Sequence, residues 1–131
     1  MISTAIYSLL YADTSIRQLV YTRIYPEKAA QGDAMPYIVY SQISQTPTDS
    51  KTNGTGFDRY RVQVTAVAES YTTCETLGGL IRTALDRKTG TYGSLVVTQI
   101  VYEDTNDIPF GLQEDSIQLY GRAVDFIVTT K

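Results

Sequence analysis

Residues 58–68 carry the pattern that most constrains the fold, because every second residue in this stretch is apolar. The alternating apolar residues are Tyr60, Val62, Val64, Ala66 and Ala68. Successive side chains of a strand point to opposite faces of a sheet, so this period of two predicts a strand with one buried face. The chain therefore contains a sheet that other elements cover on one side.

A second strand is predicted from about 37 to 45, and it pairs with 58–68 as an antiparallel hairpin. The connection at 46–57 holds no apolar residue before Phe57 and combines a proline with two glycines. Such composition is typical of a loop, and we predict that this one is long and mobile.

Helices are predicted on either side of this hairpin. Residues 2–12 place apolar side chains at helical spacing, and a short second turn follows, capped by Asp13 or Ser15. The clearest helix begins at Thr72, where Thr72 and Glu75 have the spacing of a capping box. It ends before Gly90. Its buried stripe is predicted to contain Cys74, Leu77, Gly78, Ile81, Ala84 and Leu85.

Two further strands are predicted at about 94–103 and 116–129, after a turn region at 90–93. The connection between them, near 104–115, contains a proline and a glycine. The order α-α-β-β-α-β-β predicts a single α+β domain spanning residues 1–131. Its sheet has four strands, arranged as two hairpins, with the helices packed on one face.

The composition removes several classes of function. The chain has 131 residues, a net charge of −3, one cysteine and no histidine. An acidic total disfavours an open nucleic-acid-binding surface, and a single cysteine excludes an intrachain disulfide. Without histidine the chain lacks the usual proton-transfer group and the commonest transition-metal ligand. We expect no enzymatic activity, no cofactor, no export signal and no membrane span.

Apolar residues occur on both faces of the last predicted strand. One face carries Tyr120, Val124, Phe126 and Val128, and the other carries Ile117, Leu119, Ala123 and Ile127. A small domain with helices on a single face does not need both. The chain also has eleven tyrosines, a residue type enriched at interfaces. Together these features predict contact with other subunits.

Five acidic residues crowd the predicted tip at 103–115, where no basic residue occurs: Glu103, Asp104, Asp107, Glu114 and Asp115. Four interpretations stay open. The carboxylates belong to a metal site, to a pair that cleaves glycosides, to a solvated tip, or to a docking surface or channel lining that repels DNA phosphates.

Three other features have a structural and a functional interpretation. Cys74 is either a buried small hydrophobe or a nucleophile at a helix start. The arginines Arg59, Arg61 and Arg122 form either a nucleic-acid-binding stripe or a set of solvated and paired side chains. The Gly78-Gly79 pair marks a close packing contact or a tolerated weakness in the helix.

Four short motifs occur in order along the chain: Arg23-Ile24-Tyr25-Pro26, Pro36-Tyr37-Ile38-Val39-Tyr40, Val62-Gln63-Val64 and Asp125-Phe126-Ile127-Val128. With the helical start and the helix after 72, this set resembles the tail-completion (tail-terminator) proteins of long-tailed bacteriophages, prophages and gene transfer agents. The resemblance covers nearly the whole chain.

The resemblance implies a structural virion protein of the tail and neck, present in the host cytoplasm during assembly. Its copies are expected to close as a homohexameric ring that caps the tail tube and joins it to the head-completion or connector protein. DNA is expected to pass through the ring without specific binding. Composition and expected exposure nominate the docking residues Asp49, Lys51, Phe57, Glu103, Asp104, Asp107, Phe110, Glu114 and Asp115.

Three alternatives remain beside this hypothesis. The first is another virion ring on the same scaffold, such as a head-completion or tail-tube-like protein. The second is a small carboxylate-dependent hydrolase, and the third is a monomeric binding module.

Overall fold

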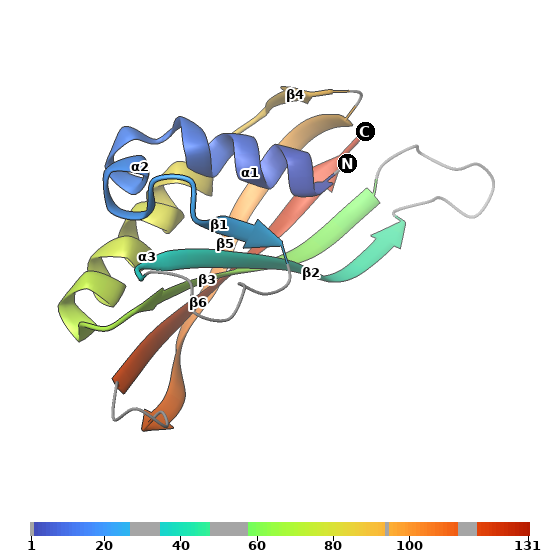
Figure 1. Cartoon of the computed structure of the whole chain (residues 1–131). Coiled ribbons are helices and arrows are strands. Elements are labelled where there is room, and N and C mark those ends of the chain that lie inside the picture. The colour runs from blue at the N-terminus through green and yellow to red at the C-terminus, as the bar shows by residue number, and fades with distance from the viewer. Residues whose placement is uncertain (1, 27–34, 48–57, 94, 113–117) are drawn as a thin grey trace.

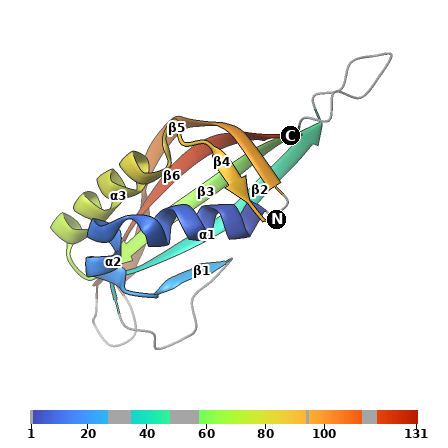
Figure 2. The ribbon, with the colours of Figure 1, turned by 90° about the horizontal axis from the view of Figure 1, so that it is seen from above.

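A computed structural model describes residues 2–26, 35–47, 58–93, 95–112 and 118–131. The helices of this part of the chain are α1 (Ile2–Ala12), α2 (Thr14–Val20) and α3 (Tyr71–Leu85). Its strands are β1 (Ile24–Pro26), β2 (Tyr37–Pro47), β3 (Asp58–Ala68), β4 (Gly90–Tyr92), β5 (Leu95–Leu112) and β6 (Gln118–Thr130). All three helices lie on one face of the sheet (Figures 1 and 2).

The six strands form one sheet in the order β1-β2-β3-β6-β5-β4. Only β1 and β2 pair in parallel among these strands. The α+β class was predicted, but the four-stranded sheet of two hairpins is wrong. Ile24–Pro26 and Gly90–Tyr92 add one strand at each edge, the latter where a turn region was expected. Strands of three residues are too short to show a period of two. The pair Ile24-Tyr25 is a short strand signal, but it was not counted as a strand of the sheet.

The sheet curls around α1. This helix contacts both edge strands, β1 and β4, as well as β2 and β5 behind them, and Figure 2 shows it lying between the two edges. The core under the helices is closely packed. Its largest fully buried side chains include Ile6, Leu10, Ile16, Leu77, Ile81 and Phe126. One sheet face is therefore filled by helices, and the other is not covered by any helix of the described residues.

The predicted strand at 58–68 is confirmed as β3, paired with β2 as expected and with β6 on its other side. Its alternation is also confirmed. Val62, Val64, Ala66 and Ala68 are almost fully buried, while Arg59 is exposed on the opposite face. The alternation of apolar and polar residues therefore predicted both the strand and the face that it turns to the core.

Strand β5 is longer than predicted. It continues from Leu95 to Leu112, so Glu103, Asp104 and Asp107 lie within a strand and not at a hairpin tip. Residues 46 and 47 likewise belong to β2. The rest of the predicted mobile loop, 48–57, lies outside the described residues.

Two helix starts differ in how well they were predicted. Asp13 caps α2 as expected, since its Oδ1 accepts a hydrogen bond from the Ile16 N–H at 3.0 Å. The capping box at Thr72 is wrong, because α3 begins at Tyr71 and its N-cap residue Ser70 makes no side-chain capping bond. None of the helices in the described ranges has the length and hydropathy needed to cross a bilayer.

Candidate functional site

A cluster of four polar side chains joins α3 to β5 and β6. We call it the Arg122 cluster: Tyr71 and Glu75 on α3, Asp107 on β5 and Arg122 on β6. Arg122 donates from Nε to Asp107 Oδ1 at 2.8 Å and from a terminal nitrogen to the Tyr71 hydroxyl at 3.0 Å. Tyr71 in turn donates to Asp107 Oδ2 at 3.0 Å. Glu75 approaches the same guanidinium at 3.8 Å.

The electrostatics of the Arg122 cluster favour the charged states of its central pair. Hydrogen bonds from Arg122 and then Tyr71 hold the pKa of Asp107 below its ordinary value of 3.8. The bond to Asp107 raises the pKa of Tyr71 above 10.0, because the phenol donates to a carboxylate. Both side chains are exposed, with 51% of the Asp107 side chain accessible. Arg122 itself is largely covered, with 18% of its side chain accessible. The cluster therefore links α3 to the sheet through one covered guanidinium and exposed partners.

Arg122 reaches this position because it lies on the helix-facing side of β6. Its strand partners are Ala66 and Asp107. A Cβ atom added to Gly78 on α3 would lie 2.6 Å from its Cδ. Arg59 and Arg61 project from the opposite face of the sheet, so the three arginines do not form one stripe. Arg61 and Arg122 are paired with carboxylates, as the alternative interpretation expected. Of the two glycines, Gly78 has a packing reason, whereas nothing lies within 4 Å of an added Cβ at Gly79.

The described acidic residues have separate partners. Glu103 forms an ion pair with Arg61 on the uncovered face of the sheet. Asp104 accepts hydrogen bonds from the Thr105 N–H at 2.8 Å and the Asn106 amide at 3.0 Å. Asp107 belongs to the Arg122 cluster. The structure therefore does not bring these three carboxylates together around one point.

The other nominated docking residues are placed only in part. Phe110 lies in β5, but its side chain is not described. Asp49, Lys51, Phe57, Glu114 and Asp115 lie outside the described residues.

This geometry does not support a pair of carboxylates that cleaves glycosides, and it does not support a metal site. A carboxyl whose pKa is lowered, as in Asp107, is a poor general acid at neutral pH, because that role needs a raised pKa. Within the described ranges no three histidine, cysteine or acidic side chains converge as a metal site requires. Cys74 is a buried small hydrophobe, as predicted. It is 2% exposed, and burial raises the pKa of its thiol.

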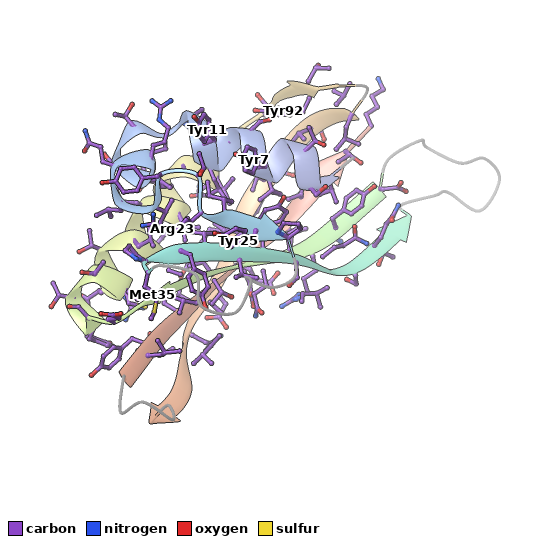
Figure 3. All side chains as sticks on the ribbon, viewed as in Figure 1. Tyr7, Tyr11, Arg23, Tyr25, Met35 and Tyr92 are labelled. Atoms are coloured by element: carbon purple, nitrogen blue, oxygen red, sulfur yellow. The ribbon has the colours of Figure 1, made fainter. Side chains whose placement is uncertain are left out.

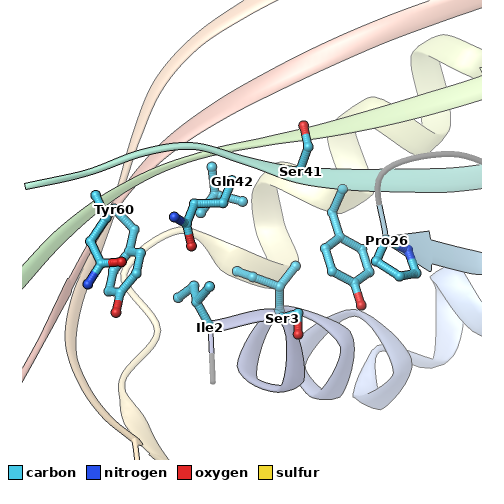
Figure 4. A pocket seen from close by; sticks show the side chains of 10 residues that line it. Ile2, Ser3, Pro26, Ser41, Gln42 and Tyr60 are labelled. Carbon is cyan, nitrogen blue, oxygen red and sulfur yellow. The ribbon is translucent and has the colours of Figure 1, made fainter.

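A groove of about 380 Å³ opens between the start of α1 and strand β2 (Figure 4). Its apolar wall is formed by Ile2, Ile6, Pro26, Tyr40, Tyr60 and Val62. The polar residues that line it are Ser3, Ser41, Gln42 and Gln45, and the Ser41 side chain points away from it to the other side of β2 (Figure 4). The sequence did not predict this groove, because it depends on where α1 crosses the sheet.

An aromatic surface covers the outside of α1 and α2. Tyr7 and Tyr11, labelled in Figure 3, stack with ring centroids 5.8 Å apart. The Arg17 guanidinium lies 5.1 Å from the Tyr11 ring centre, and Tyr21 is 62% exposed beside Arg23. Exposed tyrosines next to arginines are typical of protein contact surfaces.

The sheet face without helices carries a mixed set of side chains. Val67 and Ala123 are nearly buried there, at 3% and 2% exposure. Val101 is 42% exposed, while Val39 and Ile127 are half-buried. Of the apolar residues expected on this side of β6, Ala123 is therefore covered within one copy, whereas Ile127 remains partly accessible to a partner.

Comparison with known proteins identifies the class to which this fold and these surfaces belong. The model of the family described as tail completion protein gp17 matches residues 4–128. A chain in the solved virion of a native gene transfer agent particle has the same fold, with a TM-score of 0.73 and 15% sequence identity, over 95% of this chain and 90% of that one. No match was found among curated protein sequences. The chain belongs to the family of tail completion protein gp17, and it is a structural component of a virion, not an enzyme.

Proposed function

We propose that six copies of this chain close into a ring that caps a finished tail tube and joins it to the head connector. The family match over residues 4–128 is the observation that carries this proposal. In this role the tube face of the ring matches the last ring of the tube and halts its growth. The opposite face accepts the head-completion or connector protein. Assembly takes place in the host cytoplasm.

The surfaces of the single copy support a role in assembly. Tyr11 in α1, Tyr21 at the end of α2 and Ile43 in β2 are 36%, 62% and 54% exposed. They add to the open part of the uncovered sheet face, and tyrosine is enriched at protein contact sites. A head-to-tail contact between unlike surfaces, repeated around an axis, gives a closed ring.

The charge of the chain suits a channel through which DNA moves. The net charge is −3, and both Arg61 and Arg122 are paired with carboxylates. DNA is held mainly by basic groups that displace its counterions. A ring of such copies therefore lets the genome pass without holding it. Candidate residues for docking or for contact between copies are Asp49, Lys51, Phe57, Glu103, Asp104, Asp107, Phe110, Glu114 and Asp115.

The proposal is tested by adding the purified chain to polymerising tail-tube protein and measuring tube length by negative-stain electron microscopy. Tubes should become shorter and end in an added ring as the chain is increased, while the chain alone should form single rings. If the chain alone extends into long tubes, it is a tail-tube-like protein. If tube length does not change and no ring is added, the capping role is wrong.

A further inference from the structure

Each outer strand of the sheet pairs with only three residues of its longer neighbour. β1 pairs with residues 38–40 of β2, so among the described residues nothing pairs with the outer edge of β2 from 41 to 47. β4 pairs with residues 95–97 of β5. The α3 end then covers β5 up to Tyr102, whose N–H donates to Asp86 Oδ1 at 3.0 Å. We call residues 41–47 the β2 free edge and residues 103–112 the β5 free edge.

The two free edges lie at diagonally opposite corners of the sheet. In Figure 1, β2 extends beyond the tip of β1 at one end, and β5 extends away from β4 at the other. The strand register gives the distance, measured along the strands, by which the two free edges are displaced from each other. Ser44 is level with Ile127 of β6, whereas Asn106 on the β5 free edge is level with Ala123. Four residues of strand correspond to an offset of about 14 Å.

If Ser44 of one copy lies opposite Asn106 of the next, this offset gives a closed sheet with tilted strands. Joining the β2 free edge of one copy to the β5 free edge of the next repeats four strands per copy, a width of about 19 Å at normal strand spacing. A shift of about 14 Å over that width places the strands about 35° from the ring axis, within the tilt range of closed barrels. β2 and β5 run in opposite directions in the sheet, so the new pair is antiparallel.

The chemistry of the two edges favours this unlike pairing over the like one. The β5 free edge carries Glu103, Asp104 and Asp107, and it contains Pro109, which suits an edge because it has no N–H to donate. The β2 free edge has no charged residue. Two β5 free edges would set carboxylates against one another, which is destabilising. When a β2 free edge pairs with a β5 free edge, the carboxylates lie next to uncharged residues that include serine, glutamine and threonine.

We infer that the β2 free edge of one copy pairs antiparallel with the β5 free edge of the next copy, with Ser44 opposite Asn106. The inference rests on the proposed ring and adds the interface that closes it. This edge also lines the groove beside α1, through Ser41, Gln42 and Gln45. The added strand would therefore lie next to that groove and cover part of it. The N–H of Thr105, held by Asp104 in the single copy, becomes available to the new strand.

Disulfide trapping tests this register. Cys74 is first replaced with alanine, and Ser44→Cys and Asn106→Cys are then combined; both side chains are exposed on the uncovered face. Mild oxidation should give a ladder of covalent oligomers ending at a closed ring. A matched control combines Ser44→Cys with Thr91→Cys, an exposed position on β4, and should give no ladder.

The outcomes separate this interface from the proposed ring. If light scattering shows a ring but the Ser44 and Asn106 pair does not cross-link, or cross-links no better than the control, the ring stands and this interface is wrong. Dimers from Ser44→Cys alone would instead indicate pairing of two β2 edges and would also overturn the inference. A chain that stays monomeric at high concentration would overturn both.

Discussion

Gly78 lies directly against Arg122: a Cβ atom at Gly78 would come within 2.6 Å of the Arg122 Cδ and 3.1 Å of its Cγ. The missing side chain in α3 therefore makes the space through which Arg122 reaches Asp107 and Tyr71. Gly79, one residue later, has nothing within 4 Å of an added Cβ. The two neighbouring glycines thus have different physical roles.

Alanine substitutions should separate these roles. Gly79→Ala should raise the free energy of unfolding by up to about 1 kcal/mol, because alanine favours a helix and meets no neighbour there. Gly78→Ala should instead lower the free energy of unfolding, because the new methyl group displaces Arg122 from its partners. Urea denaturation of the two variants measures the difference. Equal stabilisation by both would show that the Gly78 contact is unimportant.

The Arg122 cluster should make stability depend on pH in the acid range. Folding lowers the pKa of Asp107 from its ordinary 3.8, so the carboxylate stabilises the fold fully above that value and loses its effect as the pH falls through the lowered one. Asp107→Asn should therefore be less stable than the wild type at pH 7, with the difference shrinking in acid. Urea denaturation between pH 7 and 2 measures it. In an Arg122→Gln background the pH-dependent difference should shrink, because only the hydrogen bond from Tyr71 remains. An unchanged difference would contradict the assignment.

The sequence predicted those parts of the fold that a local pattern specifies. Alternation located β3 and its buried face, and the apolar stripe located α3 with Cys74 inside. The edge strands β1 and β4 were left out of the predicted sheet because three residues carry no periodic signal, even though Ile24-Tyr25 has strand composition. The end of β5 was placed too early because a proline and a glycine were interpreted as loop residues, whereas this strand has an open edge that tolerates them.

The candidate sites were harder to predict, since they depend on register between distant strands. Asp107 and Arg122 lie 15 residues apart in sequence and become neighbours through the β5–β6 pairing. One signal was present: Arg122 falls between Tyr120 and Val124 on the alternating row that faces the core. The carboxylates were grouped by their closeness in sequence, although alternation and bulges send Glu103 and Asp107 to opposite faces.

Core and surface positions on the β5–β6 pair should respond differently to truncation. Phe126 is fully buried, and its ring lies 6.1 Å from that of Tyr102. Phe126→Ala should lower the free energy of unfolding by about 3–5 kcal/mol. Val101→Ala, at a position 42% exposed, should change it by no more than about 0.5 kcal/mol. Urea denaturation of both variants checks this, and a small effect at Phe126 would show that the core is assigned wrongly.

A charge on the β2 free edge should weaken assembly without unfolding the chain. Ile43 is 54% exposed at a bulge in β2, so Ile43→Asp should change the free energy of unfolding by no more than about 0.5 kcal/mol. In the ring the new carboxylate would face the acidic β5 free edge, and association should weaken at least about tenfold. Sedimentation velocity across a concentration series measures association.

Ile43→Thr is the matched control for this variant, because threonine keeps a β-branched shape without charge. It should associate more strongly than Ile43→Asp. If the two variants associate equally, a negative charge at position 43 does not weaken association. The proposed pairing would then lose its electrostatic support.

Native mass spectrometry of the untagged wild-type chain tests the central claim most directly, because it counts the copies in each assembly. A closed ring predicts one dominant species of six copies of the 14.6 kDa chain, with no series of larger assemblies as concentration rises. A chain that remains monomeric, or that forms an open series with no preferred number of copies, would contradict it.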